Sequence, residues 1–214
     1  MTVAMHIHSW LLECVSSVAK HQQVGTPSRS PYTGLSLTTK LEKYCAHLSP
    51  SSTARVCDKL NELVKVVGGT INAGSSSVSG QDPAAKKMQE HTARHRMSQM
   101  HSLMLHYFES LFDAESGPYS AGQLLVQDAV MKAVAICAAE TVLFVHNILS
   151  VEFKKLLKVC KLDAFDFWLV MKHLLMAEPK MPQNLSYHFL EIEQKIVLEW
   201  AWNSQSSLVQ MIQK

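Results

Sequence analysis

LLVQDAVMKAVAICAAETVLFVHNI, residues 124–148, is the most apolar stretch of the chain, and it decides the fold class. Apolar residues occupy nearly every helical position, as in a helix that is surrounded by protein on all sides. Lys132, Glu140 and His146 interrupt the run, so it is not expected to span a membrane. The stretch predicts a central helix, preceded by a start signal at Ser120 or Gly122.

Helical periodicity continues on both sides of this stretch, and no segment alternates with period two. Pro83 suits the first turn of a long helix whose apolar stripe runs from Met97 to Phe112. The other helices are expected over residues 35–48, 52–67, 151–162, 164–177, 185–202 and 206–213. The sequence therefore predicts an all-α fold of about eight helices without a sheet.

Three segments break this pattern and mark the organisation of the chain. Residues 22–34 and 178–184 carry prolines and are predicted to be a linker and a turn. Residues 68–82, GGTINAGSSSVSGQD, are predicted to form a flexible loop that begins where Gly68 and Gly69 end a helix. Residues 1–25 are taken as an N-terminal extension of undetermined status, and residues 26–214 as one domain.

The composition excludes several classes of protein. With 214 residues and 47% hydrophobic residues, the chain can bury a sizeable core. The net charge of +2 is too small to favour nucleic acid or a membrane surface as the main partner. The amphipathic N-terminus lacks the pattern of a secretory signal. The cysteines, which lack a paired spacing, are predicted to be reduced and buried: Cys14, Cys45, Cys57, Cys137 and Cys160.

The residues that could carry chemistry do not form a catalytic or metal-binding pattern. His91 and His95 are four apart on one predicted helix, but zinc needs three or four converging ligands. No Gly-x-Ser-x-Gly elbow and no phosphate-binding glycine loop occurs. We therefore expect no metal, no cofactor and no enzymatic activity.

A basic cluster on the long helix leaves two interpretations open. It comprises Lys86, Lys87, Arg94, His95 and Arg96. A solvated helix face is the favoured interpretation, and direct DNA binding is not expected. The alternative is a cyclin-fold module, similar to a general transcription factor, that contacts DNA through this basic helix with a salt-sensitive affinity.

Two kinase motifs lie in the predicted linker. Thr26-Pro27-Ser28-Arg29 has the Ser/Thr-Pro-x-basic pattern of cyclin-dependent kinase substrates, and Ser30-Pro31 follows at once. A phosphate adds nearly two negative charges, which can dock on arginines or a helix N-terminus. Thr26 and Ser30 are therefore candidate phosphosites. A proline-rich linker without any modification is the other interpretation.

The C-terminal half carries a family resemblance. LDAFDFW at residues 162–168, LEIEQKI at 190–196 and EWAW at 199–202 are similar, in this order, to segments of retinoblastoma-family A boxes. The run of residues 124–140 has the length and the Cys-Ala-x-Glu ending of that family's central helix. Thr26 to Arg29 resembles the regulated phosphosite at which the A box of that family begins. The resemblance covers residues 26–214.

This resemblance implies a cyclin-like helical fold with extra helices, in a nuclear protein that restrains transcription factors of the cell cycle. The A box joins a B box, and a groove between them takes the activation segment of E2-factor-type transcription factors. Glu193 and Glu115 match family residues of that groove. The Leu-x-Cys-x-Glu peptide site belongs to the B box, which this chain is expected to lack.

Other groove positions differ from the family. An aromatic residue is replaced by Val130, two family lysines by Leu169 and Tyr187, and a basic residue after Glu115 is lost near Gly117. Binding of the transcription factor is therefore expected only together with a B box. Without a B box, the helices at 124–148 and 185–202 are expected to expose a large apolar face.

Overall fold

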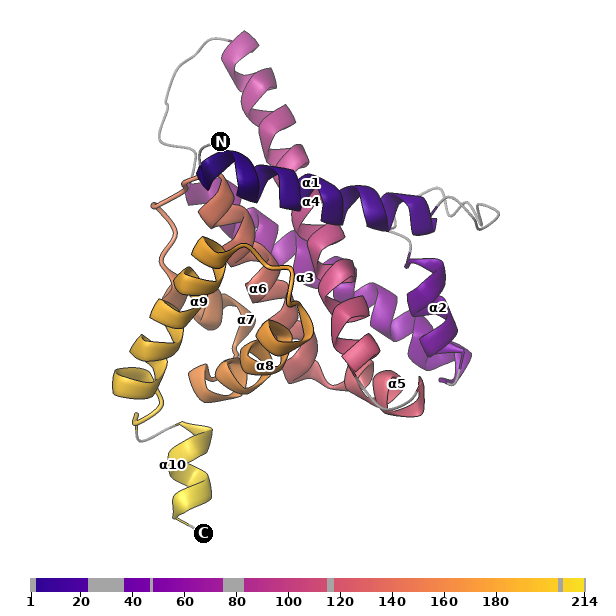
Figure 1. The fold of residues 1–214 in the computed structure, drawn as a ribbon, viewed down its shortest axis with the longest axis vertical. Helices are drawn as coiled ribbons and strands as arrows, with labels where there is room; N and C mark the ends of the chain where they lie inside the picture. The colour runs from indigo at the N-terminus through magenta and orange to yellow at the C-terminus, as the bar shows by residue number, and fades with distance from the viewer. Residues whose placement is uncertain are drawn as a thin grey trace.

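The computed structural model describes residues 3–22, 37–46, 48–74, 83–114, 118–203 and 206–213. This part of the chain contains ten α-helices, one π-helical turn and no strand (Figure 1). The all-α prediction is confirmed, with two α-helices more than expected. The helices are α1 (Val3–Gln22), α2 (Thr39–Cys45), α3 (Pro50–Gly74), α4 (Pro83–Ala114), α5 (Pro118–Val126), α6 (Asp128–Val145), α7 (Phe153–Cys160), α8 (Ala164–Ala177), α9 (Gln183–Lys195), the π-turn η1 (Ile196–Trp200) and α10 (Ser207–Ile212).

Helix α6 is the central helix that the sequence predicts. Fourteen of its eighteen residues are buried, and α3, α4, α7 and α8 pack around it. Its predicted bounds are wrong at both ends. Gln127 is extended and separates α5 from α6, so the helix begins at Asp128. Asn147 has a φ of 51°, and the backbone N–H of Ile148 donates to the carbonyl of Leu143 at 2.9 Å, which ends the helix.

Large aromatic side chains join the other helices to this core. Tyr107 and Phe108 of α4, Phe167 of α8 and Phe189 of α9 have no exposed surface. The hydroxyl groups of Tyr107 and Thr141 are hydrogen-bonded at 2.8 Å between α4 and α6, so this buried polar pair is satisfied. Aromatic residues of α4, α8 and α9 therefore lie in a core shared with α6.

Helix α1 is part of the same packed body. It lies across α4 (Figure 1), and one of its faces is buried. The buried residues follow a helical period: Ile7, Trp10, Leu11, Cys14 and Val18. The described part of the N-terminal extension is thus a helix whose apolar face belongs to the main core.

The predicted loop begins too early. Helix α3 continues through Gly68 and Gly69 to Gly74, because Val67 and Ile71 are buried on its inner face and tertiary packing overrides the weak helix propensity of glycine. A Cβ atom at Gly68 would lie 2.9 Å from Cγ of Met97, so this glycine lets α3 approach α4 closely. Residues 75–82 lie outside the described residues.

Gly69 offers a test of this helix. No atom lies within 4 Å of a Cβ built at Gly69, so alanine fits there without a clash. Gly69→Ala is expected to raise the free energy of unfolding by about 0.5–1 kcal/mol, because alanine loses less backbone entropy in a helix. Urea unfolding followed by circular dichroism measures this. A lower stability of Gly69→Ala would contradict an α3 that continues past Val67.

Candidate binding surfaces

The outer face of α8 and α9 contains Glu193, the site residue that the resemblance identifies. The indole Nε1 of Trp168 donates to Oε1 of Glu193 at 3.1 Å, and Nζ of Lys172 lies 3.0 Å from the same oxygen. Both partners come from α8, and Asp163 starts that helix by accepting from the backbone N–H of Phe165. The carboxylate is therefore held by two contacts to its Oε1 atom.

Large side chains on α8 and α9, the two helices that form this ion pair, are exposed. Leu169 is 39% exposed, Leu190 41% and Tyr187 56%. Leu169 and Tyr187 are the positions at which the resemblance places two family lysines. Val130, the replacement of a family aromatic, is buried in α6 instead. The outer face thus combines one fixed ion pair with exposed apolar residues.

Glu115, Thr26 and Ser30 lie outside the described residues. The role of Glu115 in the transcription-factor groove and the roles of Thr26 and Ser30 as phosphosites stay predictions.

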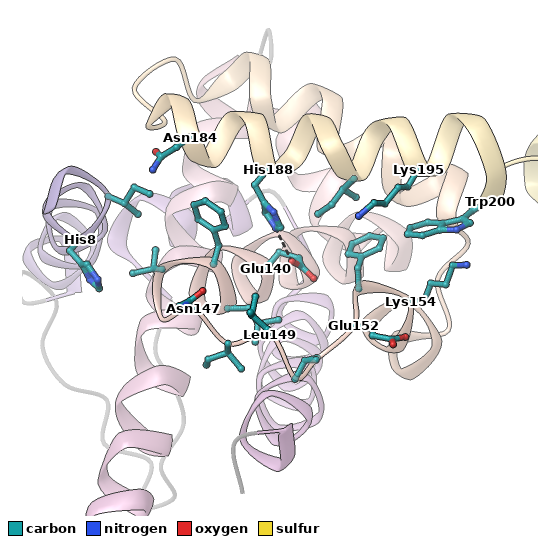
Figure 2. Close-up of a pocket in the computed structure, with 18 residues that line it drawn as sticks. His8, Glu140, Asn147, Leu149, Glu152, Lys154, Asn184, His188, Lys195 and Trp200 are labelled. Carbon is teal, nitrogen blue, oxygen red and sulfur yellow. Dashed lines mark hydrogen bonds and ion pairs between the residues drawn. The ribbon is translucent and has the colours of Figure 1, made fainter. Parts of the chain in front are cut away.

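A second candidate surface is a groove on the opposite side of α9, with a volume of about 970 Å³. Figure 2 shows it between α9, the C-terminal end of α6 and the segment 146–153, with α1 at one end. No sequence motif points to this groove. Asn147 was an available signal, because asparagine tolerates the left-handed conformation that ends α6 and turns the chain outward.

The middle of the groove contains an acid–base pair whose carboxylate is buried. Nε2 of His188 lies 3.1 Å from Oε2 of Glu140, whose side chain is only 6% exposed. The ring of His188 also stacks on Phe144, with 4.7 Å between the ring centroids. A buried carboxylate needs such a partner, and here the histidine fixes its position.

One end of the groove is basic and aromatic. Trp200 stacks on Phe153 with 5.6 Å between centroids, and Nζ of Lys154 lies 4.6 Å from the indole centroid. Lys195 projects into the same end (Figure 2). The π-turn η1 carries Trp200, and the backbone N–H of Ala201 donates to the carbonyl of Ile196 at 2.9 Å. Such a turn changes where the following side chains point.

The basic cluster lies on the N-terminal half of α4, which projects beyond the other helices (Figure 1). Lys86, Lys87, Arg94 and His95 are exposed, and Arg94 pairs with Glu90 at 3.4 Å. The exposure agrees with a solvated face. DNA binding through this helix stays the untested alternative interpretation.

The prediction of an exposed apolar face is wrong for the central helix. Helix α6 is buried within the chain itself, so the apolar excess of residues 124–148 forms the core and not an interface. Beyond α9, by contrast, large apolar side chains are exposed: Leu198 76%, Trp202 59%, Met211 60% and Ile212 65%. These exposed apolar side chains lie on η1, on the segment after it and on α10, and not on the central helix.

The cysteines behave as predicted core residues, although Cys57 is only half-buried. Burial raises the pKa of Cys14 to about 12 and the pKa values of Cys45 and Cys160 to about 11. These thiols are protonated at neutral pH and are poor nucleophiles. Within the described ranges, no three His, Cys, Asp or Glu side chains gather as metal ligands, and no helix is long and apolar enough to cross a membrane.

Comparison with known proteins agrees with this architecture. Residues 30–212 match the family described as "Retinoblastoma-associated protein A domain". The chain is 23% identical over 211 residues to a retinoblastoma-related protein of Vitis vinifera and, with the same identity and length, to one of Cocos nucifera. Each alignment covers 97% of this chain and 19% of the relative. A third relative, retinoblastoma-related protein 1 of Triticum aestivum, is 29% identical over 114 residues, covering 51% of this chain and 12% of the relative. The chain thus spans about a fifth of the length of its first relatives, and it belongs to the retinoblastoma-associated A-domain family.

Proposed function

We propose that the chain is a non-enzymatic protein-binding module of a retinoblastoma-like pocket protein. It acts in the nucleus and regulates the cell cycle by restraining transcription factors. The family match over residues 30–212 supports this proposal, because the A domain of this family is a cyclin-fold helical domain of pocket proteins. The all-helical architecture described above agrees with that fold.

The binding site in this proposal is the outer face of α8 and α9. The observation that carries it is the fixed carboxylate of Glu193, with Trp168 at 3.1 Å and Lys172 at 3.0 Å. A carboxylate already oriented by two donors can accept from a partner without losing much further side-chain entropy. The exposed Leu169 and Leu190 provide apolar area beside it. The ligand is the acidic and apolar activation segment of an E2-factor-type transcription factor.

This binding requires a B-box pocket half. Leu198, Trp202, Met211 and Ile212 are exposed after α9, and removing apolar side chains from water stabilises a complex. Each Å² of apolar surface removed from water contributes about 25 cal/mol. The B box is proposed to cover these C-terminal apolar side chains. It is also proposed to complete the transcription-factor groove at the outer face of α8 and α9.

Restoring the two family lysines tests the site. The double variant Leu169→Lys, Tyr187→Lys is expected to raise the affinity for an acidic activation peptide about tenfold or more, because each lysine adds a charge opposite to that of the ligand. Both positions are exposed, so the fold should tolerate the change. The measurement is fluorescence anisotropy of a labelled activation peptide, with the chain and a B-box polypeptide present together.

The matched control adds two lysines elsewhere. Leu12 and Val66 are 57% and 40% exposed and lie on α1 and α3, away from α8 and α9. Leu12→Lys, Val66→Lys should change the affinity by less than about twofold. Equal gains in both double variants would show that net charge, and not the outer face, attracts the peptide. No binding to any variant in the presence of the B box would contradict the proposed function.

A further inference from the structure

We propose that the groove on the opposite side of α9 is a second peptide site, which takes an acidic and apolar segment of a partner protein. This site is separate from the outer face of α8 and α9 and does not require it. His188, Ile192 and Lys195 line the groove, whereas Glu193 points to Trp168 and Lys172 of α8. The two sets of side chains leave α9 in different directions.

The size and the apolar lining of the groove suit a peptide. Its volume of about 970 Å³ lies at the upper end of the range of roughly 300–1,000 Å³ that is usual for ligand sites. Leu143, Phe144 and Ile192 provide an apolar base. Leu149 lies at the rim and is 87% exposed. Covering such an exposed leucine with a second chain removes apolar surface from water and so favours binding.

The polar groups of the groove are placed to hold a peptide backbone. Asn147 and Asn184 lie at the end near α1 (Figure 2), and their amides can both donate and accept. His188 and Glu140 form the buried pair in the middle, and the carboxylate has only 6% of its side chain exposed. Polar groups at fixed positions within an apolar lining set the orientation of a bound chain.

The other end selects negative charge. Lys154 and Lys195 both line it, and Glu152 is the one carboxylate that lies with them. Besides Glu152, the groove is lined by one other carboxylate, that of Glu140, which pairs with His188 in the middle of the groove. An acidic side chain of the bound segment would supply the opposite charge.

Charge reversal in the isolated chain tests this site. The probe is a short fluorescein-labelled peptide in which two acidic residues precede a run of leucines, compared with the same peptide carrying two lysines instead. Lys154→Glu, Lys195→Glu should weaken binding of the acidic peptide about tenfold or more and strengthen binding of the lysine peptide. Leu149→Asp should weaken binding of both peptides, because it places a charge on the apolar rim.

Matched variants separate this proposal from a general charge effect and from the proposed function. Lys65→Glu and Leu12→Asp change exposed residues on α3 and α1 and should alter the affinity by less than about twofold. Glu193→Lys should leave binding to the groove unchanged, whereas it should weaken transcription-factor binding with the B box. Thermal unfolding confirms that each variant is folded.

Four results would overturn the proposal. The first is equal binding of the acidic and the lysine peptide, and the second is an equal loss in Lys65→Glu and in the groove variant. The third is self-association that Leu149→Asp abolishes, since the occupant would then be a second copy of the chain. Binding that only Glu193→Lys removes would place the peptide on the outer face and would likewise contradict a separate groove site.

Discussion

Replacing Trp10 by alanine is expected to lower the free energy of unfolding by about 3–5 kcal/mol, the usual cost of truncating a large buried aromatic side chain. Trp10 is only 6% exposed, and Leu11 beside it is 1% exposed. Helix α1 packs on α4 and also contacts α6, so the cavity would open within the main core. Residues before the family match at residue 30 would then stabilise the whole domain.

Leu12 provides the matched control on the same helix. Its side chain is 57% exposed, so Leu12→Ala should change the stability by about 0.5 kcal/mol or less. Urea unfolding at constant pH measures both variants, and an unchanged slope with denaturant shows that the same transition is compared. If Trp10→Ala were as stable as Leu12→Ala, α1 would not be part of the folded core.

The same variant links α1 to the groove. Ile7 and His8 of α1 line one end of the groove, and the rings of His8 and His146 meet edge to face with 6.1 Å between centroids. If α1 were loosened from α4, the groove would lose the side chains that form this end. Helix α1 is therefore expected to stabilise the domain and also to shape one end of the second peptide site.

Helical periodicity predicted a helix most accurately where residues at its ends, such as a capping residue or a proline, also mark its boundaries. Helix α8 spans Ala164–Ala177, as predicted, because Asp163 caps its start and a proline-containing turn follows. The start of α6 also had a signal that was overlooked. Asp128 stands in its first turn and pairs with Lys132 one turn later, a pattern that favours a helix beginning at Asp128.

Other features depend on contacts that a sequence does not display. The length of α3 is set by the burial of Val67 and Ile71 against the rest of the core, which outweighs two consecutive glycines. The groove likewise needs residues from five elements to converge, and its buried pair joins Glu140 to His188 across 48 positions of sequence. The spacing of residues within one helix predicts neither the length of α3 nor the groove.

The outer face shows the opposite case. Glu193 was identified from a motif alone, and the structure adds the reason for its orientation, namely Trp168 and Lys172 of the preceding helix. The pair with Trp168 joins positions 25 residues apart. A family motif can therefore point to a residue, whereas its partners become visible only once α8 and α9 are packed.

Acidification from pH 7 to pH 5 is expected to lower the stability by about 2 kcal/mol through His101 alone. His101 is 5% exposed, and burial lowers its pKa from 6.5 to about 4. The folded state therefore keeps this histidine neutral, while the unfolded chain takes up a proton near pH 6.5. The stabilising contribution is fully present above that pH and is lost progressively as the pH falls toward 4.

His146 adds to this loss in the same direction. Burial, together with the charges of Arg96, His8 and His95, lowers its pKa to about 4, and Nε2 of His146 lies 2.7 Å from Oε1 of Gln99. Because His146 is only half-buried, solvent screening makes its contribution smaller than that of His101. Both histidines therefore act within the same window, between pH 6.5 and pH 4.

His101→Leu removes the larger of the two contributions and thus isolates it. The variant should lose about 2 kcal/mol less than the parent chain between pH 7 and pH 5, because leucine has no proton to gain on unfolding. Urea unfolding at both pH values gives this difference. The matched control is His91→Leu on the exposed half of the same helix, which should retain the full pH dependence. A parent and a His101→Leu variant with equal losses would show that the acid sensitivity arises elsewhere in the chain.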